Sequence, residues 1–546
     1  MGEAAPSYSH GVSDTALLGE TIGENLRRTV ERHPDGDALV SRHQGLRLSY
    51  AELDAEVDRV ALGLLAAGIE KGDRVGIWAP NCAEWVFVQY ASAKIGAVLV
   101  NVNPAYRTHE LEYALRQSGV RLLVSAQSFK TSDYAAMVDE VRGELDRLER
   151  VVFTEDGSWD ELLEAGAGRD AAALAERAGE LAFDDPINIQ YTSGTTGSPK
   201  GATLSHHNIL NNGFFVGELL GYGAEDRVCI PVPFYHCFGM VMGNLGATTH
   251  GACMVIPAPA FEPAATLEAV AEERCTSLYG VPTMFIAELD DPDFAGHDLS
   301  SLRTGIMAGS PCPAEVMKRV QDEMHMAEVA ICYGMTETSP VSTQTRKHDT
   351  LERRVGSVGR AGPHIEIKVV DPESGRVVPR GEGGEFCTRG YSVMLGYWEE
   401  PEKTAEAIDA AGWMHTGDLA TMDADGYCSI VGRIKDMAIR GGENVYPREI
   451  EEFLYEHPAV ADVQVVGVPD PKYGEELCAW VVTREDESAS EDEIRDFCRD
   501  KLAHFKVPRY VIFTEEFPMT VTGKVQKYKL REESMERLGL GDAVAS

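Results

Sequence analysis

A run of small and hydroxyl-bearing residues that ends in a lysine is the part of the sequence best suited to hold phosphate. It extends from Tyr191 to Gly201 and reads Tyr-Thr-Ser-Gly-Thr-Thr-Gly-Ser-Pro-Lys-Gly, directly after a strand-like run at 187–191. Glycine lets the backbone approach a ligand closely, so successive N–H groups and hydroxyls can surround phosphate oxygens while the lysine adds positive charge. The phosphate-binding candidates are Thr192, Ser193, Gly194, Thr195, Thr196, Gly197, Ser198, Pro199 and Lys200.

Two other interpretations of this segment are weaker. A flexible Ser/Gly/Thr linker is the usual meaning of such a composition, but the preceding strand and the terminal Lys-Gly pair disfavour it. A Walker A loop requires a Gly-Lys-Ser or Gly-Lys-Thr ending, whereas Lys200 is followed by Gly201 and lies three residues after Gly197. The sequence therefore predicts a phosphate loop of a different kind.

Four further segments combine polar and aromatic residues that could serve the same chemistry. They are Pro233-Phe-Tyr-His-Cys-Phe-Gly, Tyr333-Gly-Met-Thr-Glu-Thr (with Gly309-Ser-Pro upstream), Trp413-Met-His-Thr-Gly-Asp and Pro518-Met-Thr-Val-Thr-Gly-Lys-Val-Gln-Lys. Taken singly, each has an ordinary interpretation: a core histidine, a turn with a surface glutamate, a turn cap and a surface lysine. A Cys–His hydrolase is disfavoured, because nothing near His236 and Cys237 in the sequence supplies an orienting acid.

Alternating helical and strand patterns supply the framework for these segments. A helix is predicted at 49–69, where Ser49 and Glu52 have the spacing of a capping box and Gly68 is a C-cap candidate. Strand-like runs follow at 74–78, 97–102, 120–124 and 151–153, with helical patterns between them. This rhythm predicts an α/β fold of layered subdomains with largely parallel sheets.

The pattern changes after Gly359. Residues 359–432 contain short strand-like runs separated by turn signals, which predicts a smaller β-rich subdomain. Strands at 460–468 and 477–483 around a Pro-Asp-Pro turn, and a helix at 490–505 capped by Ser490 and Glu493, predict a compact α+β domain. We therefore predict a large N-terminal domain at 1–432, a hinge at 433–436 and a small mobile C-terminal domain at 437–546.

The net charge excludes some classes of partner. The chain has 546 residues with 50 Lys plus Arg and 88 Asp plus Glu, so 50 − 88 gives a formal net charge of −38. Nucleic acids and anionic membranes bind a basic face, which so acidic a chain offers only with strong charge segregation. The hydrophobic content of 44% is that of a globular protein, and the length predicts two or three domains.

Cysteine use and hydropathy predict a soluble cytoplasmic protein. The 11 cysteines form neither a CxxC pair nor a His/Cys ligand cluster, which disfavours a disulfide framework or a structural metal. The start of the chain lacks the basic and apolar regions of a secretory signal. The most apolar stretch, at 85–102, is interrupted by Lys94 and Gly96, so no membrane span is expected. The oligomeric state is left open, with a homodimer as one option.

The motifs, in this order, resemble those of the adenylate-forming superfamily, which contains acyl-CoA synthetases, peptide-synthetase adenylation domains and luciferases. The resemblance extends from about Thr21 to Leu530, and medium-chain or broad-range fatty acyl-CoA synthetases are the most similar members. It implies an AMP-forming ligase whose substrates are ATP, CoA and a small-molecule carboxylic acid, with Mg²⁺. A carboxylate attacks the α-phosphorus of ATP to give an acyl-adenylate and pyrophosphate. The CoA thiolate then attacks the acyl carbonyl and AMP leaves.

The resemblance also implies roles for residues of the nucleotide site. Tyr333 is expected to stack on the adenine, Thr336 to contact phosphate and Glu337 to hold Mg²⁺, which prefers one or two carboxylates together with phosphate oxygens. Asp418 is expected to accept hydrogen bonds from the ribose hydroxyls, and Arg433 to reach the ribose or a phosphate. The segments expected beside the adenine are Gly309, Ser310, Pro311 and Gly334.

Further roles concern the acid, CoA and the catalytic lysine. Lys524 is expected to bridge the carboxylate and the α-phosphate, and His236 to wall the acyl pocket. Lys435 occupies the hinge position, about which the C-terminal domain rotates to withdraw Lys524 and bring in the CoA tunnel of Arg440, Gly441 and Gly442. The acyl-pocket candidates are His236, Phe238, Gly239, Thr283, Met284 and Gly309.

Two questions stay open at this level. Related enzymes on the same framework pass the activated acid to a carrier-protein thiol, an amine or another nitrogen nucleophile, so this alternative acceptor stands beside CoA. A non-catalytic nucleotide-binding protein is disfavoured because Lys200, Glu337, Asp418, Arg433 and Lys524 are all present. The apolar candidate pocket suits an aliphatic or aryl acid without fixing which one.

The acidic charge of the chain also poses a question, because ATP and CoA are themselves anionic. We predict a local reversal of sign in the active cleft. The cations assigned there or to the hinge are Lys200, Arg433, Lys435, Arg440, Lys524 and Lys527.

Overall fold

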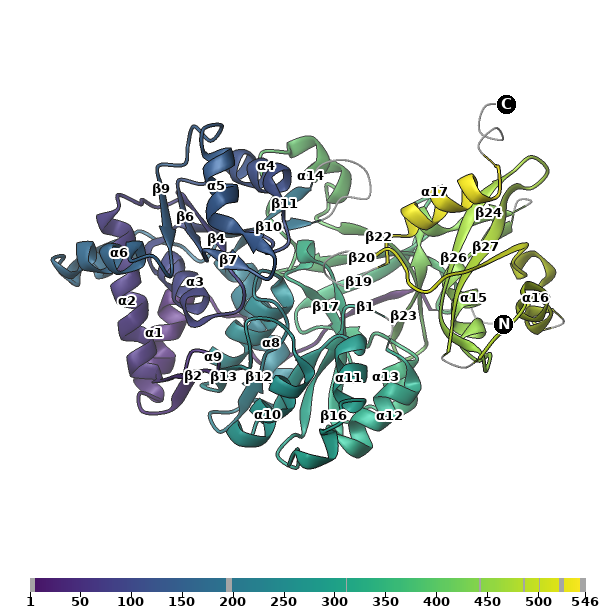
Figure 1. Cartoon of the computed structure of the whole chain (residues 1–546), viewed down its shortest axis with the longest axis horizontal. Helices are drawn as coiled ribbons and strands as arrows, with labels where there is room; N and C mark the ends of the chain where they lie inside the picture. Colours follow the sequence, from purple (N-terminus) through teal and green to yellow (C-terminus); the bar gives the residue numbers. More distant parts are fainter. Residues whose placement is uncertain are drawn as a thin grey trace. The chain divides into compact units, whose positions relative to one another are not determined.

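The computed structural model describes residues 5–192, 199–310, 312–440, 443–484, 487–499, 501–519 and 525–540. The chain forms two compact units, and Figure 1 follows it from the N-terminus to the C-terminus by colour. The larger unit comprises Ser9–Ile367 and Thr388–His415, and the smaller unit comprises Met1–Tyr8, Lys368–Cys387 and Thr416–Ser546. The predicted α/β fold, with a large N-terminal domain and a smaller C-terminal domain, is confirmed. The predicted boundaries at 432/433 and 436/437 stay predictions.

The first sheet of the larger unit has seven strands in the order β21-β11-β10-β5-β4-β6-β9. The strands from β10 to β9 pair in parallel, while β11 and β21 form an antiparallel edge. Their bounds are β4 (Arg74–Trp78), β5 (Val98–Asn101), β6 (Leu122–Ser125), β9 (Arg150–Phe153), β10 (Pro186–Thr192), β11 (Lys200–Ser205) and β21 (Gly396–Tyr397). The four strands predicted between 74 and 153 are therefore present.

The second sheet of the larger unit has nine strands in the order β18-β17-β16-β15-β14-β12-β13-β2-β3. Its centre, from β16 to β2, is parallel, and antiparallel strands close both edges. The bounds are β2 (Asp37–Ser41), β3 (Leu46–Ser49), β12 (Arg227–Cys229), β13 (Cys253–Ile256), β14 (Ser277–Gly280), β15 (Thr304–Ala308), β16 (Glu328–Gly334), β17 (Val341–Gln344) and β18 (Arg360–Ala361). A two-stranded ribbon adds β7 (Ser128–Phe129) and β8 (Ser132–Asp133).

Helices cover these two sheets, and α8 contacts strands of both of them. The first helices are α1 (Ile22–Arg32), α2 (Tyr50–Ala66), α3 (Ala83–Ile95), α4 (Thr108–Ser118), α5 (Tyr134–Arg142), α6 (Ser158–Ala167), α7 (Ala172–Ala178) and α8 (His206–Leu220). The later helices are α9 (Gly246–Thr248), α10 (Pro263–Glu273), α11 (Pro282–Leu289), α12 (Ala314–Glu323), α13 (Leu351–Val355) and α14 (Pro401–Ala407). Two 3₁₀ turns, η2 (Phe294–Gly296) and η3 (Thr336–Thr338), and a fully buried π-helix, η1 (Phe238–Leu245), complete this unit.

Local sequence explains where these helices begin. The Ser49 side chain accepts a hydrogen bond from the N–H of Glu52, whose carboxylate accepts one from the Ser49 N–H, so α2 starts with the predicted capping box. Gly68, at a φ of +84°, takes the left-handed conformation just after the helix. The apolar face of the helix, with Leu53 and Val57 fully buried, then packs into the core of the larger unit.

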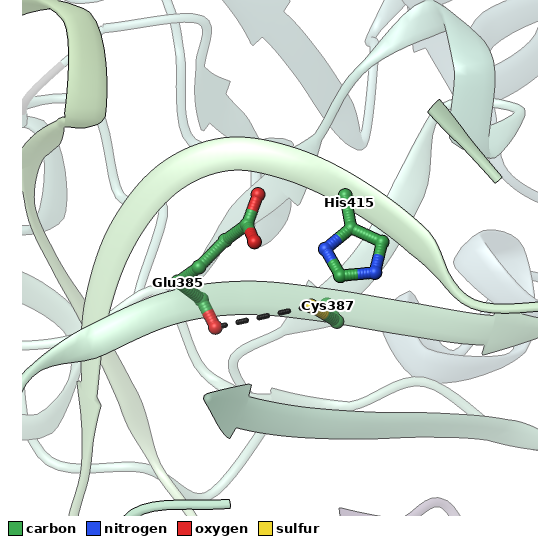
Figure 2. A group of neighbouring side chains, drawn as sticks. All are labelled: Glu385, Cys387 and His415. Atoms are coloured by element: carbon green, nitrogen blue, oxygen red, sulfur yellow. Dashed lines mark hydrogen bonds between the residues drawn. The ribbon is translucent and has the colours of Figure 1, made fainter. Parts of the chain in front are cut away.

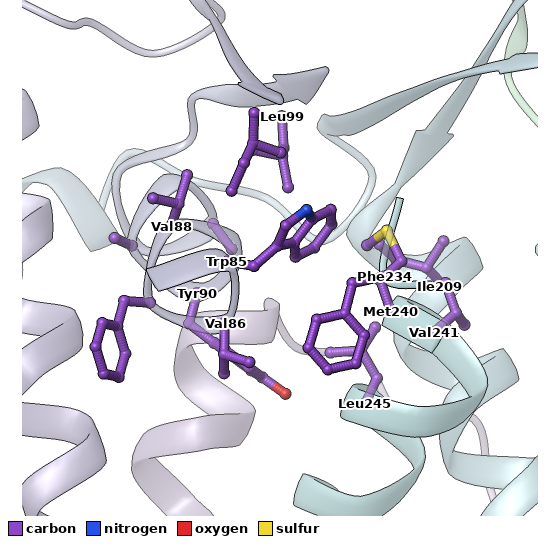
Figure 3. Packing of buried hydrophobic residues seen from close by; sticks show 14 of the residues in the cluster. Trp85, Val86, Val88, Tyr90, Leu99, Ile209, Phe234, Met240, Val241 and Leu245 are labelled. Atoms are coloured by element: carbon purple, nitrogen blue, oxygen red, sulfur yellow. The ribbon is translucent and has the colours of Figure 1, made fainter. Parts of the chain in front are cut away.

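The core of the larger unit is continuous between helices and sheets. Figure 3 shows Trp85 of α3 facing Phe234, Met240 and Leu245, so residues far apart in sequence share one apolar interior. The ring centroids of Trp85 and Phe234 lie 5.8 Å apart in an edge-to-face arrangement. Each such buried side chain contributes roughly 1.5–3 kcal/mol of transfer free energy. The η1 segment is thereby held from several sides.

The smaller unit contains part of the β-rich region and the whole C-terminal part of the chain. The sheet β1-β19-β20-β22-β23 comprises β1 (Tyr8–His10), β19 (Ile365–Val370), β20 (Gly384–Gly390), β22 (Met414–Met422) and β23 (Cys428–Arg433), and the chain passes between the units inside the first four of these strands. The C-terminal sheet has the order β25-β24-β27-β26, with β28 beside β27. The helices and strands of this C-terminal part are η4 (Ile434–Asp436), β24 (Ala438–Arg440), β25 (Glu443–Val445), α15 (Pro447–Leu454), β26 (Val460–Asp470), β27 (Gly474–Thr483), α16 (Glu491–Cys498), η5 (His504–Lys506), β28 (Tyr510–Phe513) and α17 (Lys527–Arg537).

One predicted element is shorter than expected. The Ser490–Glu493 capping box starts α16, but the helix ends at Cys498 rather than near Phe505. Arg499 is extended, with a φ of −62° and a ψ of 146°, so the chain leaves the helix there. Phe497, Leu502 and Phe505 still pack against the C-terminal core from outside the helix or at its end. The apolar pattern therefore indicated burial correctly and helix length wrongly.

Candidate active site

The two strands that flank the predicted phosphate loop in the sequence pair with each other. Strands β10 and β11 pair antiparallel, and Thr192 at the end of the first lies opposite Lys200 at the start of the second. Ser193, Gly194, Thr195, Thr196, Gly197 and Ser198 lie outside the described residues. Pro199 is described, and its carbonyl accepts a hydrogen bond of 3.0 Å from the Tyr113 hydroxyl. The two ends of the loop are therefore fixed by pairing and by a side chain of α4.

Glu337 lies beside this pair of strands. Its Oε1 accepts a 2.9 Å hydrogen bond from the Tyr397 hydroxyl and a 3.3 Å hydrogen bond from Thr192 Oγ1. The Lys200 Nζ lies 4.7 Å from the centroid of the Tyr397 ring, a cation–π distance. Tyr397 thus contacts both the predicted metal-binding carboxylate and the predicted phosphate lysine.

Tyr397 is a site residue that sequence reasoning missed. It belongs to β21, a strand of two residues that pairs with β11, and its N–H donates to Thr404 Oγ1 at 2.9 Å. Burial, with Glu337 as a further cause, raises the pKa of the Tyr397 hydroxyl, which keeps it protonated as a donor. The signal in the sequence is only Gly396-Tyr397 shortly before Pro401, far from every other motif.

The residues present fit a magnesium ion. Glu337 is 5% exposed, and the two hydrogen bonds that its carboxylate accepts from side chains of described residues both end on Oε1. A carboxylate oxygen beside a phosphate loop is the ligand that Mg²⁺ uses together with substrate phosphates. The donor set of this cluster therefore suits the predicted ion.

The predicted adenine-binding residues lie at the ends of two adjacent parallel strands. Ala308 at the end of β15 is opposite Cys332 of β16, so Gly309 and Ser310 follow one strand where Tyr333 and Gly334 end the next. Such strand ends are the usual ligand-binding edge of a parallel sheet. A Cβ at position 334 would lie 1.7 Å from the Pro340 carbonyl oxygen, so only glycine fits there. Pro311 lies outside the described residues.

The His236 segment adjoins Thr336. His236 Nδ1 accepts a 3.1 Å hydrogen bond from the Phe238 N–H, an arrangement that places the ring proton of the neutral imidazole on Nε2. The Cys237 Sγ lies 3.7 Å from the same Nδ1 and 3.9 Å from Thr336 Oγ1. Two predicted catalytic residues, His236 and Thr336, are therefore linked through one buried thiol.

Four other acyl-pocket candidates lie on η1 and α11, and the fifth, Gly309, follows β15. The Phe238 ring stacks on Tyr279 with centroids 5.6 Å apart, and Thr283 and Met284 are in the first turn of α11. A Cβ on Gly239 would lie 2.4 Å from the Pro233 carbonyl oxygen, so this position also requires glycine. These contacts show that the segment 233–245 is folded back tightly on itself.

The predicted ribose-binding residues are neighbours in the smaller unit. Asp418 of β22 lies opposite Arg433 of β23, and Arg433 Nε donates to Asp418 Oδ1 at 3.1 Å. The turn before Asp418 is held by β20, because the Gly417 N–H donates to Glu385 Oε1 at 3.1 Å. Figure 2 shows Glu385 on that strand, with the Cys387 thiol donating to its carbonyl oxygen. The Asp418 carboxylate is therefore well fixed.

Two of the remaining predicted cations, Arg440 and Lys527, have carboxylate partners. Arg440 Nη2 lies 2.8 Å from Glu476, and its Nη1 donates to the carbonyls of Phe505 and Val507. Lys527 Nζ lies 2.6 Å from Glu451. Gly441, Gly442 and Lys524 lie outside the described residues. Lys435, the predicted hinge residue, lies in η4.

Comparison with known proteins accounts for this set of motifs. Residues 26–398 match the family model described as AMP-binding enzyme, and residues 449–524 match the AMP-binding enzyme C-terminal domain. The chain belongs to the AMP-binding enzyme family. The recognised adenylate-forming superfamily is thereby confirmed, and the match covers both the large domain and the C-terminal domain.

Two curated relatives are similar over nearly their whole length. The candidate acyl-CoA synthetase YngI of Bacillus subtilis (strain 168) is 50% identical over 96% of this chain and 99% of that protein. The mitochondrial medium-chain acyl-CoA ligase ACSF2 of Danio rerio is 46% identical over 98% of this chain and 91% of that protein. Within the superfamily the chain is therefore most like medium-chain acyl-CoA synthetases.

Solved structures show the same fold. The anthranilate CoA ligase AuaEII, in complex with anthranoyl-AMP, has a TM-score of 0.85 and 29% identity, covering 96% of this chain and 99% of that chain. The amide bond synthetase McbA of Marinactinospora thermotolerans has a TM-score of 0.80 and 28% identity, covering 94% and 99%.

The family and these relatives define the reaction. The protein is an AMP-forming acid–thiol ligase that activates a carboxylic acid with ATP and transfers it to CoA. Within the described ranges no helix is long and apolar enough to cross a membrane.

Proposed function

We propose that the acid is a medium-chain fatty acid, that Glu337 holds Mg²⁺, and that the reaction takes place in the cytoplasm as part of fatty acid metabolism. The observation that carries the substrate proposal is the 46% identity to a medium-chain ligase over 98% of the chain. The fully buried, apolar η1 segment beside His236 supports it, because an alkyl chain requires an apolar wall.

In the first half-reaction a carboxylate oxygen attacks the α-phosphorus of ATP and pyrophosphate leaves. The chain contributes positioning and charge, since no covalent intermediate with the protein is needed. Lys200 and the backbone of the 193–198 loop hold the β- and γ-phosphates, and Lys524 bridges the carboxylate and the α-phosphate. The neutral His236, with its proton on Nε2, can donate a hydrogen bond to the incoming acid. Bound Mg²⁺ supplies charge neutralisation for the leaving pyrophosphate.

Tyr397 holds Glu337 and Lys200 next to each other in this phosphate site. Its hydroxyl holds Oε1 of Glu337, whose carboxylate would hold Mg²⁺, and its ring lies against the Lys200 ammonium. Asp418 binds the ribose hydroxyls, with Arg433 holding the carboxylate through the 3.1 Å hydrogen bond. Each of these groups stabilises ATP in the orientation that in-line attack requires.

In the second half-reaction the CoA thiolate attacks the acyl carbonyl and AMP leaves. We propose that the part of the chain after Lys435 rotates between the two steps, which withdraws Lys524 and brings Gly441 and Gly442 to the acyl-adenylate. Glycine suits a narrow tunnel because it has no side chain to block the thiol. Such a rotation is a conformational gate between two anionic reactants.

A second acceptor deserves a test because an amide bond synthetase has the same fold. The experiment is a pyrophosphate-release assay with butyrate, octanoate, palmitate, benzoate and phenylalanine, each with CoA, with ammonium or with neither. We expect octanoate with CoA to give the highest kcat/KM. A preference for benzoate or phenylalanine would refute the substrate proposal. Formation of an amide without any acyl-CoA would show that the acceptor is a nitrogen nucleophile rather than CoA.

A further inference from the structure

A chain of buried side-chain amides joins strand β10 to the segment that carries His236. Gln190 Nε2 donates to Asn188 Oδ1 at 2.8 Å, and Asn188 Nδ2 donates to Asn101 Oδ1 at 2.9 Å. Asn101 Nδ2 in turn donates to the Tyr235 carbonyl at 2.9 Å, one residue before His236. Gln190 and Asn101 are 3% exposed and Asn188 is fully buried. The chain of donors therefore runs in one direction through the core.

The same amides converge on the first turn of the π-helix η1. Asn101 Nδ2 and Gln190 Nε2 lie 3.1 and 3.2 Å from the sulfur of Met240. The Met240 carbonyl accepts a 3.0 Å hydrogen bond from Gln89 Nε2 of α3. Figure 3 shows Met240 within the apolar cluster, beside Ile209 and Phe234. Polar groups therefore hold both sides of the residues 235–240 inside an otherwise apolar core.

Stability alone does not explain these amides. A buried amide that loses its partner costs about 1–3 kcal/mol, whereas apolar side chains of the same shape would fill the space without that liability. What the amides add is direction, because each N–H donates along its own bond and each carbonyl oxygen accepts near the plane of its amide. They fix the main chain at Tyr235 relative to β10, whose last residue, Thr192, leads into the phosphate loop. A π-helix is also a frequent mark of a functional segment.

We propose that Asn101 is a positioning residue for the acid substrate. It holds the 235–240 segment in register with the strand that enters the phosphate loop, so that His236 meets the carboxylate where ATP presents its α-phosphorus. Asn101 contacts neither ATP nor the acid in this proposal and acts through the Tyr235 carbonyl and the Met240 sulfur. The inference rests on the proposed role of His236 in the acid pocket.

The experiment measures the apparent KM for octanoate and for ATP in ATP–pyrophosphate exchange, with the full chain. Asn101→Ala is expected to raise the KM for octanoate at least five-fold and to change the KM for ATP less than two-fold. Met240→Leu, which keeps the side-chain volume and removes only the sulfur acceptor, is expected to raise the octanoate KM at least two-fold with little change in Tm. If Asn101→Ala does not fold, the octanoate KM of Met240→Leu tests the proposal in its place.

The matched control is Asn211→Ala. Asn211 is buried like Asn101, and its amide bonds the N–H and carbonyl of Leu18 at 2.7 and 3.1 Å rather than the 235–240 segment. It is expected to lower Tm as Asn101→Ala does and to leave both KM values unchanged. Unchanged octanoate KM in both test variants, while His236→Ala raises it, would overturn this inference and leave the proposed function standing. An unchanged octanoate KM in His236→Ala would instead refute the acid pocket on which both depend.

Discussion

The hydroxyl of Tyr397 donates a 2.9 Å hydrogen bond to Oε1 of Glu337, although the two residues lie 60 positions apart in the sequence. The same tyrosine ring lies 4.7 Å beneath the Lys200 ammonium. The carboxylate assigned to Mg²⁺ and the cation assigned to the phosphates therefore share one aromatic support. This relationship makes the contributions of the hydroxyl and of the ring separable by mutation.

Tyr397→Phe removes only the hydroxyl. A hydrogen bond to a charged group is worth roughly 1.5–3 kcal/mol, so we expect the Mg²⁺ concentration for half-maximal activity to rise about ten-fold or more. Tyr397→Leu removes the ring as well and is expected to raise the KM for ATP in addition. Tyr50→Phe is the control, because it removes another buried tyrosine hydroxyl, bonded to the Ala252 carbonyl at 2.7 Å, in the same unit. Identical Mg²⁺ dependence in Tyr397→Phe and Tyr50→Phe would contradict the assignment.

Lys524→Ala is expected to abolish formation of the acyl-adenylate and to leave thioester formation from synthetic octanoyl-AMP and CoA largely intact. The reason is that the lysine charge is proposed to act only while the α-phosphorus is attacked. Lys529→Ala, an exposed lysine of α17, is the control and should behave as the unmodified enzyme. An equal loss in both half-reactions would reject the division of labour between the two conformations.

Asp418→Asn keeps the shape of the side chain and removes its charge. A carboxylate that accepts bonds from both ribose hydroxyls should favour ATP over 2′-deoxyATP and 3′-deoxyATP, and we expect the variant to lose about ten-fold in kcat/KM for ATP. The decisive readout is discrimination, since the variant should treat the three nucleotides more alike. If Asp418→Asn still prefers ATP over the two deoxynucleotides as strongly as the unmodified enzyme, then Asp418 does not bind the ribose.

Glu288 offers a test of the pH dependence of stability. Its side chain is 1% exposed, and in the described ranges neither carboxylate oxygen has a hydrogen-bond partner. Burial raises the pKa of this carboxyl well above its ordinary value. An acid with a raised pKa binds its proton more tightly when folded, so its contribution to stability is lost as the pH rises above the unfolded value near ~4.3.

Glu288→Met should therefore stabilise the protein, and more so at higher pH. Removal of an unpaired buried polar group is worth about 1–3 kcal/mol, and each kcal/mol shifts Tm by roughly 2–4 °C in a large domain. We expect the gain in Tm, measured by thermal unfolding, to be smaller at pH 5 than at pH 8. A gain that shrinks from pH 5 to pH 8 would contradict this account of the carboxyl.

Some of this structure could be predicted because short-range chemistry determines it. The capping boxes at Ser49 and Ser490 place helix starts through hydrogen bonds between residues three apart, and both are present. Strand β4 begins and ends at the predicted residues, since a buried parallel strand is a continuous apolar run. The nucleotide motifs carry their chemistry in contiguous residues, so the family could be recognised from them.

Other features depend on contacts that no local pattern encodes. Tyr397 reaches Glu337 only because β21 pairs with β11. The π-helix η1 was not predicted, because its residues have the same apolar pattern as an ordinary buried helix. Arg440, expected in the CoA tunnel, bonds Glu476 and three main-chain carbonyls of its own unit, which no spacing in the sequence indicates.

Product analysis of one reaction tests the central claim most directly. The enzyme is incubated with ATP, Mg²⁺, octanoate and CoA, and the products are separated, identified and quantified by mass spectrometry. We predict octanoyl-CoA, AMP and pyrophosphate in equal amounts, and octanoyl-AMP retained by the enzyme when CoA is withheld. Pyrophosphate release with octanoyl-AMP as the end product in the presence of CoA, or no reaction with octanoate at all, would contradict the account.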